Sequence, residues 1–275
     1  MRDHDPVERS TQNSIEKLYE MISAARYCTS LTGAGVSTLS GIRDFRGKNG
    51  LYNEMDAEKI FDLGYFNRDP SFYYKAADSF IYNLDEKKAS IVHLTLGKLE
   101  KKGLLKAVIT QNIDLLHQKG GSRRVIEIHG SPSIHYCRRC SDLRRVEALA
   151  AAKGEVKPSE TDLLGFTETA ALVHAGKLPR CGKCGAVLKP AITFFGEGLP
   201  VRALEEAERA ARETDVMLVL GTSLTVFPAA GLPQAVIRSG GKIVMVNNME
   251  TPLDRFAALK FTDLETVFQG LDARL

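Results

Sequence analysis

Short apolar runs alternate along the chain with stretches in which apolar residues recur at helical spacing. The runs have the length of strands and are apolar throughout, which is typical of a parallel sheet covered on both faces. They occupy residues 27–32, 104–110, 125–129, 215–220 and 242–246. The helical stretches lie at residues 15–22, 70–80, 90–103, 199–212, 228–238 and 263–275, with a shorter one before Gly120. The pattern predicts an α/β fold with a parallel sheet and helices on both faces.

Two segments interrupt this alternation. Residues 137–184 lack strong strand runs, and residues 47–89 are rich in aromatic side chains. We therefore expect a large domain made of residues 11–47, 90–135 and 190–275. The small domain would consist of residues 136–189 together with a helical insert at residues 48–89.

Small and polar residues stand at the ends of all five predicted strands. Ligands of parallel sheets bind at the carboxyl ends of the strands, so these residues predict one binding site. They are Gly33-Ala34-Gly35, Gln111-Asn112, His129, Gly221-Thr222-Ser223 and Asn247.

The turn after the first strand has glycines at Gly33 and Gly35, which let the main chain approach a pyrophosphate closely. Thr38 stands where a dinucleotide-binding fingerprint has its third glycine, so a plain tight turn is the alternative. The connection runs on to Gly47 through Asp44-Phe45-Arg46, whereas an ordinary connection has about 4–6 residues. We expect this loop to close over a nucleotide.

Four of the five cysteines form two Cys-x-x-Cys pairs, and the fifth, Cys28, lies in an apolar run as a core residue would. Two such pairs can supply four thiolates to one tetrahedral Zn²⁺, which leaves no position for water and makes the site structural. The ligands would be Cys137, Cys140, Cys181 and Cys184. Redox dithiols or surface thiols are the alternative, and His135 is expected to be a bystander.

The 37 basic and 34 acidic residues give a net charge of +3, too even a balance for direct nucleic-acid binding through a basic face. The N-terminus lacks the apolar stretch of a signal peptide. No run approaches the ~20 apolar residues that span a bilayer. We therefore expect a cytoplasmic protein that does not bind a membrane, and the pattern indicates no oligomeric state.

An ordered set of motifs resembles the sirtuins, the family of NAD⁺-dependent protein deacylases. The resemblance spans about residues 31–248, and both cysteine pairs fall between its third and fourth motifs. The motifs are residues 33–47, Thr110-Gln111-Asn112-Ile113-Asp114, His129-Gly130, Phe194-Phe195-Gly196-Glu197 after Pro190, Gly221-Thr222-Ser223 and Val246-Asn247. Arg43 replaces the proline that usually precedes Asp-Phe-Arg in the family. The resemblance implies a Rossmann-like NAD-binding domain with a small zinc-ribbon and helical domain.

The resemblance also implies roles for the motif residues. His129 would be the general base, for which a pKa near 6.5 is suitable. Asn112, the second catalytic residue, and Asp114 would orient the ribose and the nicotinamide carboxamide, although capping of the next helix is the alternative for both. Gln111 would contact the ribose, Phe45 would shield the reacting carbon, and Arg46 would place the ribose-phosphate. The remaining cofactor contacts would be Gly33, Ala34, Gly35, Thr38, Ile113, Gly221, Thr222, Ser223, Asn247 and Asn248. The resemblance places no adenine contact near the C-terminus.

The substrate implied by the resemblance is an acylated lysine of another protein. Its tunnel would be lined by Phe194, Phe195, Gly196 and Glu197. The main chain of Ile192 and Thr193 would pair with the peptide as an added strand. Family members that prefer acidic acyl chains carry Tyr-x-x-Arg, whereas the aligned stretch here is Tyr73-Tyr74-Lys75-Ala76. Because the arginine is absent, we expect acetyl or another uncharged acyl group.

Three other functions remain open at this point. Protein mono-ADP-ribosyl transfer is the main alternative, but it has less need of both Asn112 and His129. A binding module without turnover would not need a complete catalytic set. A dehydrogenase would need an acidic residue about 20 residues beyond the glycine turn, and Glu54 lies in the wrong context for that role.

Overall fold

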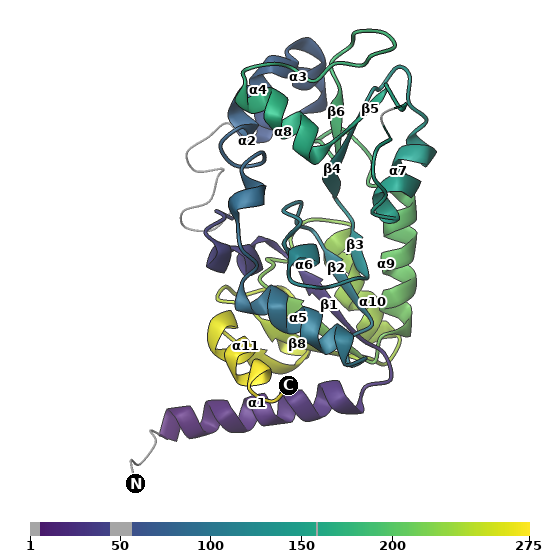
Figure 1. Cartoon of the computed structure of the whole chain (residues 1–275). Coiled ribbons are helices and arrows are strands. Elements are labelled where there is room, and N and C mark those ends of the chain that lie inside the picture. Colours follow the sequence, from purple (N-terminus) through teal and green to yellow (C-terminus); the bar gives the residue numbers. More distant parts are fainter. Residues whose placement is uncertain (1–5, 45–56, 158) are drawn as a thin grey trace.

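The computed structural model describes residues 6–44, 57–157 and 159–275 (Figure 1). Its larger sheet has six parallel strands in the order β3-β2-β1-β7-β8-β9. The strands are β1 (Cys28–Thr32), β2 (Ala107–Thr110), β3 (Val125–Glu127), β7 (Val216–Leu220), β8 (Lys242–Val246) and β9 (Ala257–Phe261). Since β2 and β3 lie on one side of β1 and β7 to β9 on the other, the strand order reverses between β1 and β7. In open α/β sheets this is the place where a ligand binds.

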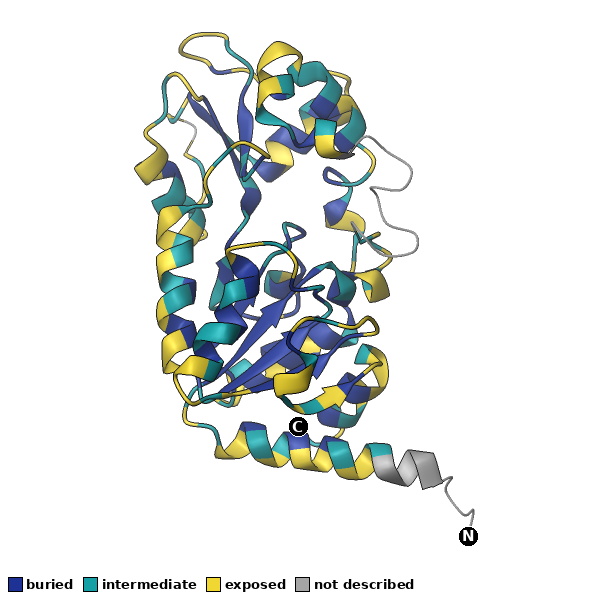
Figure 2. Cartoon of the chain, turned by 180° about the vertical axis from the view of Figure 1, so that it is seen from behind, coloured by how far each residue is buried: buried dark blue, intermediate teal, exposed yellow. Residues whose placement is uncertain are grey.

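Helices cover both faces of this sheet because the side chains of successive strand residues point to opposite faces. In β7, Leu218 and Leu220 pack toward one face, and Met217 and Val219 toward the other. The first face is covered by α1 (Pro6–Ala24), α5 (Ile91–Lys101) and α11 (Leu264–Asp272), and the second by α9 (Val201–Glu213) and α10 (Leu232–Arg238). Figure 2 shows the strands buried between helices whose outer sides are exposed. Each large apolar side chain buried in this way contributes about 1.5–3 kcal/mol.

A second, antiparallel sheet has three strands in the order β5-β4-β6, and it lies above the larger sheet in Figure 1. The strands are β4 (Gly130–Tyr136), β5 (Leu163–Gly165) and β6 (Lys189–Ile192). The helices around them are α2 (Ala57–Ile60), α3 (Leu63–Arg68), α4 (Pro70–Ala77), α7 (Leu143–Ala151) and α8 (Phe166–His174). An aromatic core that includes Phe66, Tyr73, Phe166 and Phe194 packs α3, α4, α8 and the end of β6 together.

Short helices complete the connections between these elements. They are the α-helix α6 (Leu116–Lys119) and the 3-10 helices η1 (Ala34–Ser40), η3 (Leu84–Glu86), η4 (Ala229–Gly231) and η5 (Asp254–Phe256). Among the described residues, no helix is both long enough and apolar enough to cross a bilayer.

The predicted fold class and all five predicted strands are confirmed. Two elements of the sheets differ from the prediction, namely β9 and the three-stranded sheet, which no apolar run indicated. β9 lies at the edge of its sheet, and its residues alternate between partly buried and exposed. The helix expected over residues 70–80 ends at Ala77, and Asp69 caps it by accepting the Ser71 amide at 3.1 Å. The division into two domains at the expected residues stays a prediction.

Candidate active site

The carboxyl ends of the parallel strands open into a cavity of about 630 Å³ that also reaches the end of β6. Most residues that the sequence predicted as ligand contacts line it. They are Gly33, Ala34, Gly35, Thr38, Gln111, Asn112, Ile113, His129, Ile192, Thr193, Phe194, Phe195, Gly196, Glu197, Gly221, Thr222, Ser223, Asn247 and Asn248. Asp114 is buried and does not line the cavity. Phe45, Arg46 and Glu54 lie outside the described residues.

The glycines Gly33, Gly35 and Gly221 allow the main chains at the ends of β1 and β7 to pack directly against each other. The Gly33 amide donates to the Leu220 carbonyl at 3.0 Å, and the Gly35 amide donates to the Gly221 carbonyl at 2.9 Å. A Cβ on Gly35 would lie 2.8 Å from the Gly221 Cα, and Gly221 itself has φ 56°. Side chains at these positions would push apart the two strand ends that form the floor of the cavity.

Asn112 is fixed by the turn that it faces. Its Nδ2 donates to the Gly33 carbonyl at 3.0 Å and to Ser37 Oγ at 3.2 Å. Because both amide protons are engaged, Oδ1 is the atom that is left to accept a hydrogen bond. Ser37, which the motif analysis did not single out, therefore links the glycine turn to the end of β2.

Asp114 binds the Ser37 hydroxyl, which also contacts Asn112, and it has a second partner in α6. Its Oδ2 accepts the Ser37 hydroxyl at 2.5 Å, and its Oδ1 accepts the Leu116 amide at 2.9 Å at the start of α6. The N-cap position of α6 is Leu115, without a side-chain cap bond, so neither Asn112 nor Asp114 is the N-cap. Asp114 instead supports the turn before the helix through the Leu116 amide. A direct contact of Asp114 with a cofactor stays a prediction.

His129 follows β3 and lies on the cavity wall. Its Nδ1 bonds to the Gln111 carbonyl at 2.7 Å, and since a carbonyl only accepts, Nδ1 carries the proton. Nε2 is then the basic nitrogen of a neutral ring. Burial lowers the pKa of His129, although the bond to Gln111 acts in the opposite direction. The ring is therefore neutral at pH 7, as a general base must be.

The segment after β6 is bonded within the protein on both sides. The Thr193 amide donates to the His129 carbonyl at 2.8 Å, and the Phe195 amide donates to the Phe61 carbonyl at 2.7 Å. The Phe195 carbonyl accepts the Leu63 amide at 3.1 Å. The Thr193 amide is therefore engaged within the protein, and the pairing of a substrate strand with the main chain of Ile192 and Thr193 stays a prediction.

Several lining residues were not predicted as ligand contacts, although two of them, Leu39 and Asp44, lie in the motif of residues 33–47. They are Leu39, Asp44, Phe61, Leu199, Val226, Phe227, Met249, Thr262, Asp263 and Leu264. The last four come from segments that follow β8 and β9, so the unpredicted β9 brings the C-terminal part of the chain to the cavity.

The charged side chains of the cavity wall are mainly acidic. Asp44, Glu197 and Asp263 line it, and neither lysine nor arginine does so within the described ranges 6–44, 57–157 and 159–275. Lys75 is exposed and lies outside the lining, while Tyr73 and Tyr74 are buried in the aromatic core. The wall thus offers a carboxylate ligand no lysine or arginine partner from these residues.

The four predicted cysteines converge at one place, with all their sulfur atoms within 4.8 Å of one another. A tetrahedral zinc ion with bonds of ~2.3 Å would hold its ligands ~3.8 Å apart. The Sγ atoms of Cys137 and Cys184 are 3.5 Å apart, so the cluster fits such an ion with little movement. His135 contributes no ligand atom to this cluster and instead bonds to the Tyr82 hydroxyl at 2.8 Å.

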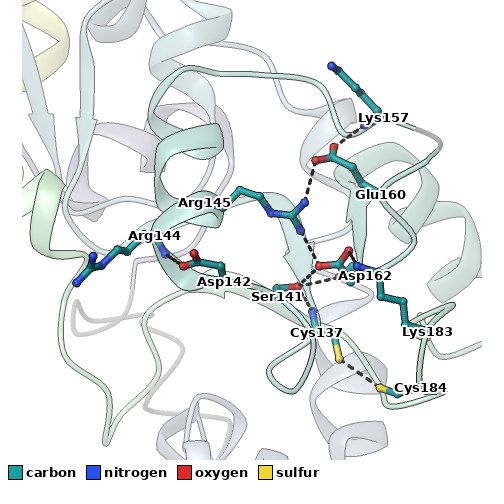
Figure 3. A network of polar contacts seen from close by, with 10 residues as sticks. All are labelled: Cys137, Ser141, Asp142, Arg144, Arg145, Lys157, Glu160, Asp162, Lys183 and Cys184. Carbon is teal, nitrogen blue, oxygen red and sulfur yellow. Dashed lines mark hydrogen bonds and ion pairs between the residues drawn. The ribbon is translucent and has the colours of Figure 1, made fainter.

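A buried carboxylate, Asp162, holds the two cysteine pairs together (Figure 3). Its Oδ2 accepts the Ser141 hydroxyl at 2.8 Å and Arg145 at 2.6 Å, and its Oδ1 pairs with Lys183 at 2.7 Å. Its carbonyl accepts the Cys137 amide at 2.9 Å. Ser141 follows the first pair and Lys183 lies inside the second, so the long spacer supplies the residue that connects them.

Comparisons with known proteins agree with this geometry. The sequence model of the Sir2 family matches residues 33–228. A Thermotoga maritima protein named NAD-dependent protein deacetylase is 41% identical over 247 residues, which are 90% of this chain and 92% of that protein. A solved Sir2–p53 peptide–NAD⁺ structure has a TM-score of 0.80 at 37% identity, covering 94% of this chain and 98% of the other. Sir2Tm bound to a propionylated peptide has a TM-score of 0.79 at 35% identity, with the same coverage.

Proposed function

Because the chain belongs to the Sir2 family, we propose that it is an NAD⁺-dependent protein-lysine deacylase. It would remove an uncharged acyl group, above all acetyl, and release nicotinamide and O-acyl-ADP-ribose. The observation that carries the proposal is the neutral His129, held by the Gln111 carbonyl on the wall of a cavity that also reaches Asn112 and residues 192–197.

The strand order supports one orientation of NAD⁺ in the cavity. Asn112 and His129 follow β2 and β3 at one side of the sheet, whereas Asn248 and Asp263 follow β8 and β9 at the other. Neighbouring strands are ~4.8 Å apart, so these groups are separated by a distance comparable to an extended dinucleotide. We place the nicotinamide ribose near Asn112 and the adenosine near Met249 and residues 262–264, with Gly33, Gly35 and Gly221 beneath the phosphates.

Each catalytic side chain has one task in the proposed reaction. The acyl oxygen of the substrate attacks C1′ of the nicotinamide ribose, and nicotinamide leaves. Asn112 Oδ1 accepts from a ribose hydroxyl and orients it, because both protons of its amide are engaged by Gly33 and Ser37. Nε2 of His129 then takes the proton of a ribose hydroxyl that attacks the resulting imidate carbon. Phe45 and Arg46 are proposed to shield C1′ and to place the ribose-phosphate.

The acyl group is proposed to enter past Ile192 and Phe194, which belong to the aromatic core. A succinyl or similar anionic group would bring its carboxylate toward a wall with Glu197 and without a cation from the described residues. Acetyl and other uncharged groups carry no such cost of desolvating an unpaired charge.

We further propose that the cysteine cluster binds a structural zinc ion through Cys137, Cys140, Cys181 and Cys184. The four thiolates would give the ion a closed shell without an open position for water, so its role would be structural and not catalytic. Cysteines gathered for a metal are also typical of a reducing compartment, which supports a cytoplasmic location.

The role of His129 is tested by the variant His129→Ala. We expect deacetylation to fall by ~10²–10⁴-fold, since this is the usual contribution of a positioned general base. NAD⁺ binding, measured by calorimetry, should persist. His174→Ala is the matched control, because His174 is exposed and pairs with Asp78 at the surface. An unchanged rate in His129→Ala would exclude the general-base role.

A further inference from the structure

Lys189 is a lysine in the interior of the protein, with a side chain only 1% exposed. It is the first residue of β6. This strand leads to residues 192–197, the part of the cavity lining that is proposed to receive the acyl-lysine and is called the acyl-lysine wall below. A charged ammonium group in such a place is costly unless every proton has an acceptor. No function is yet assigned to it.

All three protons of the ammonium group have partners on the segment that follows. Lys189 Nζ donates to the Pro190 carbonyl at 3.1 Å and to the Ile192 carbonyl at 2.7 Å, and it pairs with Glu197 Oε2 at 2.8 Å. The Phe194 ring centroid lies 4.1 Å from Nζ, within the range of a cation–π contact. The ammonium group therefore connects the beginning of the wall segment with its end.

Glu197 transmits this connection to the turn that forms the wall. The same Oε2 accepts the Phe194 amide at 2.9 Å, while the Glu197 amide donates to the Phe194 carbonyl at 3.0 Å. Gly196 has φ 92°, which closes the turn between them. If the ammonium group were lost, the Glu197 carboxylate would lose its counter-ion. The carboxylate would then turn toward solvent, and its bond to the Phe194 amide, which holds the turn, would break.

We propose that Lys189 is a positioning residue for the acyl-lysine substrate, because its ammonium group holds the Phe194–Glu197 turn in the shape that receives the acyl chain. The inference rests on the proposed deacylase function. Among the described residues, the polar and cation–π contacts of Lys189 lie on Tyr136 and on residues 190–197 and not on the strand ends that bind NAD⁺ in our proposal. Peptide recognition should therefore depend on Lys189, and NAD⁺ recognition should not.

The same geometry makes peptide binding depend on pH. Burial lowers the pKa of Lys189 to about 8, although Glu197 acts against this. Burial also lowers the pKa of the neighbouring His135 to about 3 and raises that of Tyr136 to about 12. The positive charge of Arg138 also lowers the pKa of Lys189.

Two further tyrosines, Tyr73 and Tyr74 of α4, pack near Phe194 and Leu188, and burial raises the pKa of both. Between about pH 7 and 9, Lys189 is therefore the group of this cluster that changes charge, and the ion pair with Glu197 is lost as the pH rises.

The test compares Lys189→Met, Lys189→Arg and the control Lys177→Met, a change at an exposed lysine. Steady-state kinetics with an acetyl-lysine peptide should show a peptide KM raised by about ten-fold in Lys189→Met, with the KM for NAD⁺ within about two-fold of wild type. Lys189→Arg should restore most of the peptide KM, because the guanidinium group keeps the charge. Peptide affinity without turnover, from calorimetry, should follow the same order.

The pH series gives the second readout. The peptide KM of the wild type should rise from about pH 7 to 9, whereas that of Lys189→Arg should stay flat, since arginine does not lose its proton. Equal peptide KM values for Lys189→Met and wild type, or parallel pH profiles for Lys189→Arg and wild type, would overturn the inference. If Lys189→Met does not fold, Glu197→Gln replaces it with the same expectation. If the wild type binds the peptide but does not turn it over, the deacylase proposal is refuted. The role of Lys189 is then tested by the calorimetric peptide affinities of the same variants.

Discussion

At the scale of single residues, His129 is neutral because burial disfavours the imidazolium form more than the Gln111 carbonyl stabilises it. A general base acts in its neutral form, so activity is lost as the pH falls through a pKa that lies below the ordinary 6.5. We expect the acid limb of kcat/KM for NAD⁺, at saturating acetyl peptide, to be centred below the ordinary histidine value of 6.5. An acid limb centred above 6.5 would show that the ring is not kept neutral in this way.

The residues of the cavity could be predicted from the sequence where their type is unusual for a strand end. Gly33, Asn112 and His129 interrupt apolar runs, and the parallel sheet brings such positions to one edge. Lys189 could not be found in this way, because lysine is almost never fully buried and its position reads as surface. Ser37 and Asp263 were missed for a similar reason, since they are common turn and cap residues.

At the scale of elements, the strands that lie inside the large sheet could be predicted because both of their faces are buried. β1 and β7 are buried at every position. β9 and β5 have no continuous apolar run, since the first is an edge strand and the second has three residues. β9 pairs with β8 and β5 pairs with β4, and such pairing is set by tertiary contacts and not by an apolar run.

The two cysteine pairs depend on Asp162 as a connection between elements. Asp162→Asn keeps the volume of the side chain but removes the charge that Arg145 and Lys183 share. We expect the zinc-loaded variant to release zinc to a chromogenic chelator about 10-fold faster or more, as is usual when a group that orients metal ligands is lost. Asp142→Asn is the control, because Asp142 is exposed and asparagine also caps helices. Equal release rates for Asp162→Asn and wild type would contradict the role of Asp162.

At the scale of the whole molecule, the cavity joins groups from two sheets. The larger sheet supplies Asn112, His129 and the glycines Gly33, Gly35 and Gly221 at the ends of β1 and β7. The strand β6 of the smaller sheet leads to residues 192–197. The Thr193 amide bonds to the His129 carbonyl at 2.8 Å, so the proposed general base and the proposed substrate segment, residues 192–197, are directly connected through main chain. A reaction between a dinucleotide and an acylated side chain needs this arrangement, since both substrates must meet beside His129.

The most direct test of this account is the reaction of the purified, zinc-loaded protein with an acetyl-lysine peptide and NAD⁺, followed by peptide mass and by nicotinamide release. The account predicts that the peptide loses its acetyl group only when NAD⁺ is present, with one nicotinamide released for each acetyl group removed. A succinylated peptide of the same sequence should react far more slowly, because the described wall offers its carboxylate no cation. Nicotinamide release without loss of acetyl would indicate ADP-ribosyl transfer or glycohydrolysis and would contradict the account.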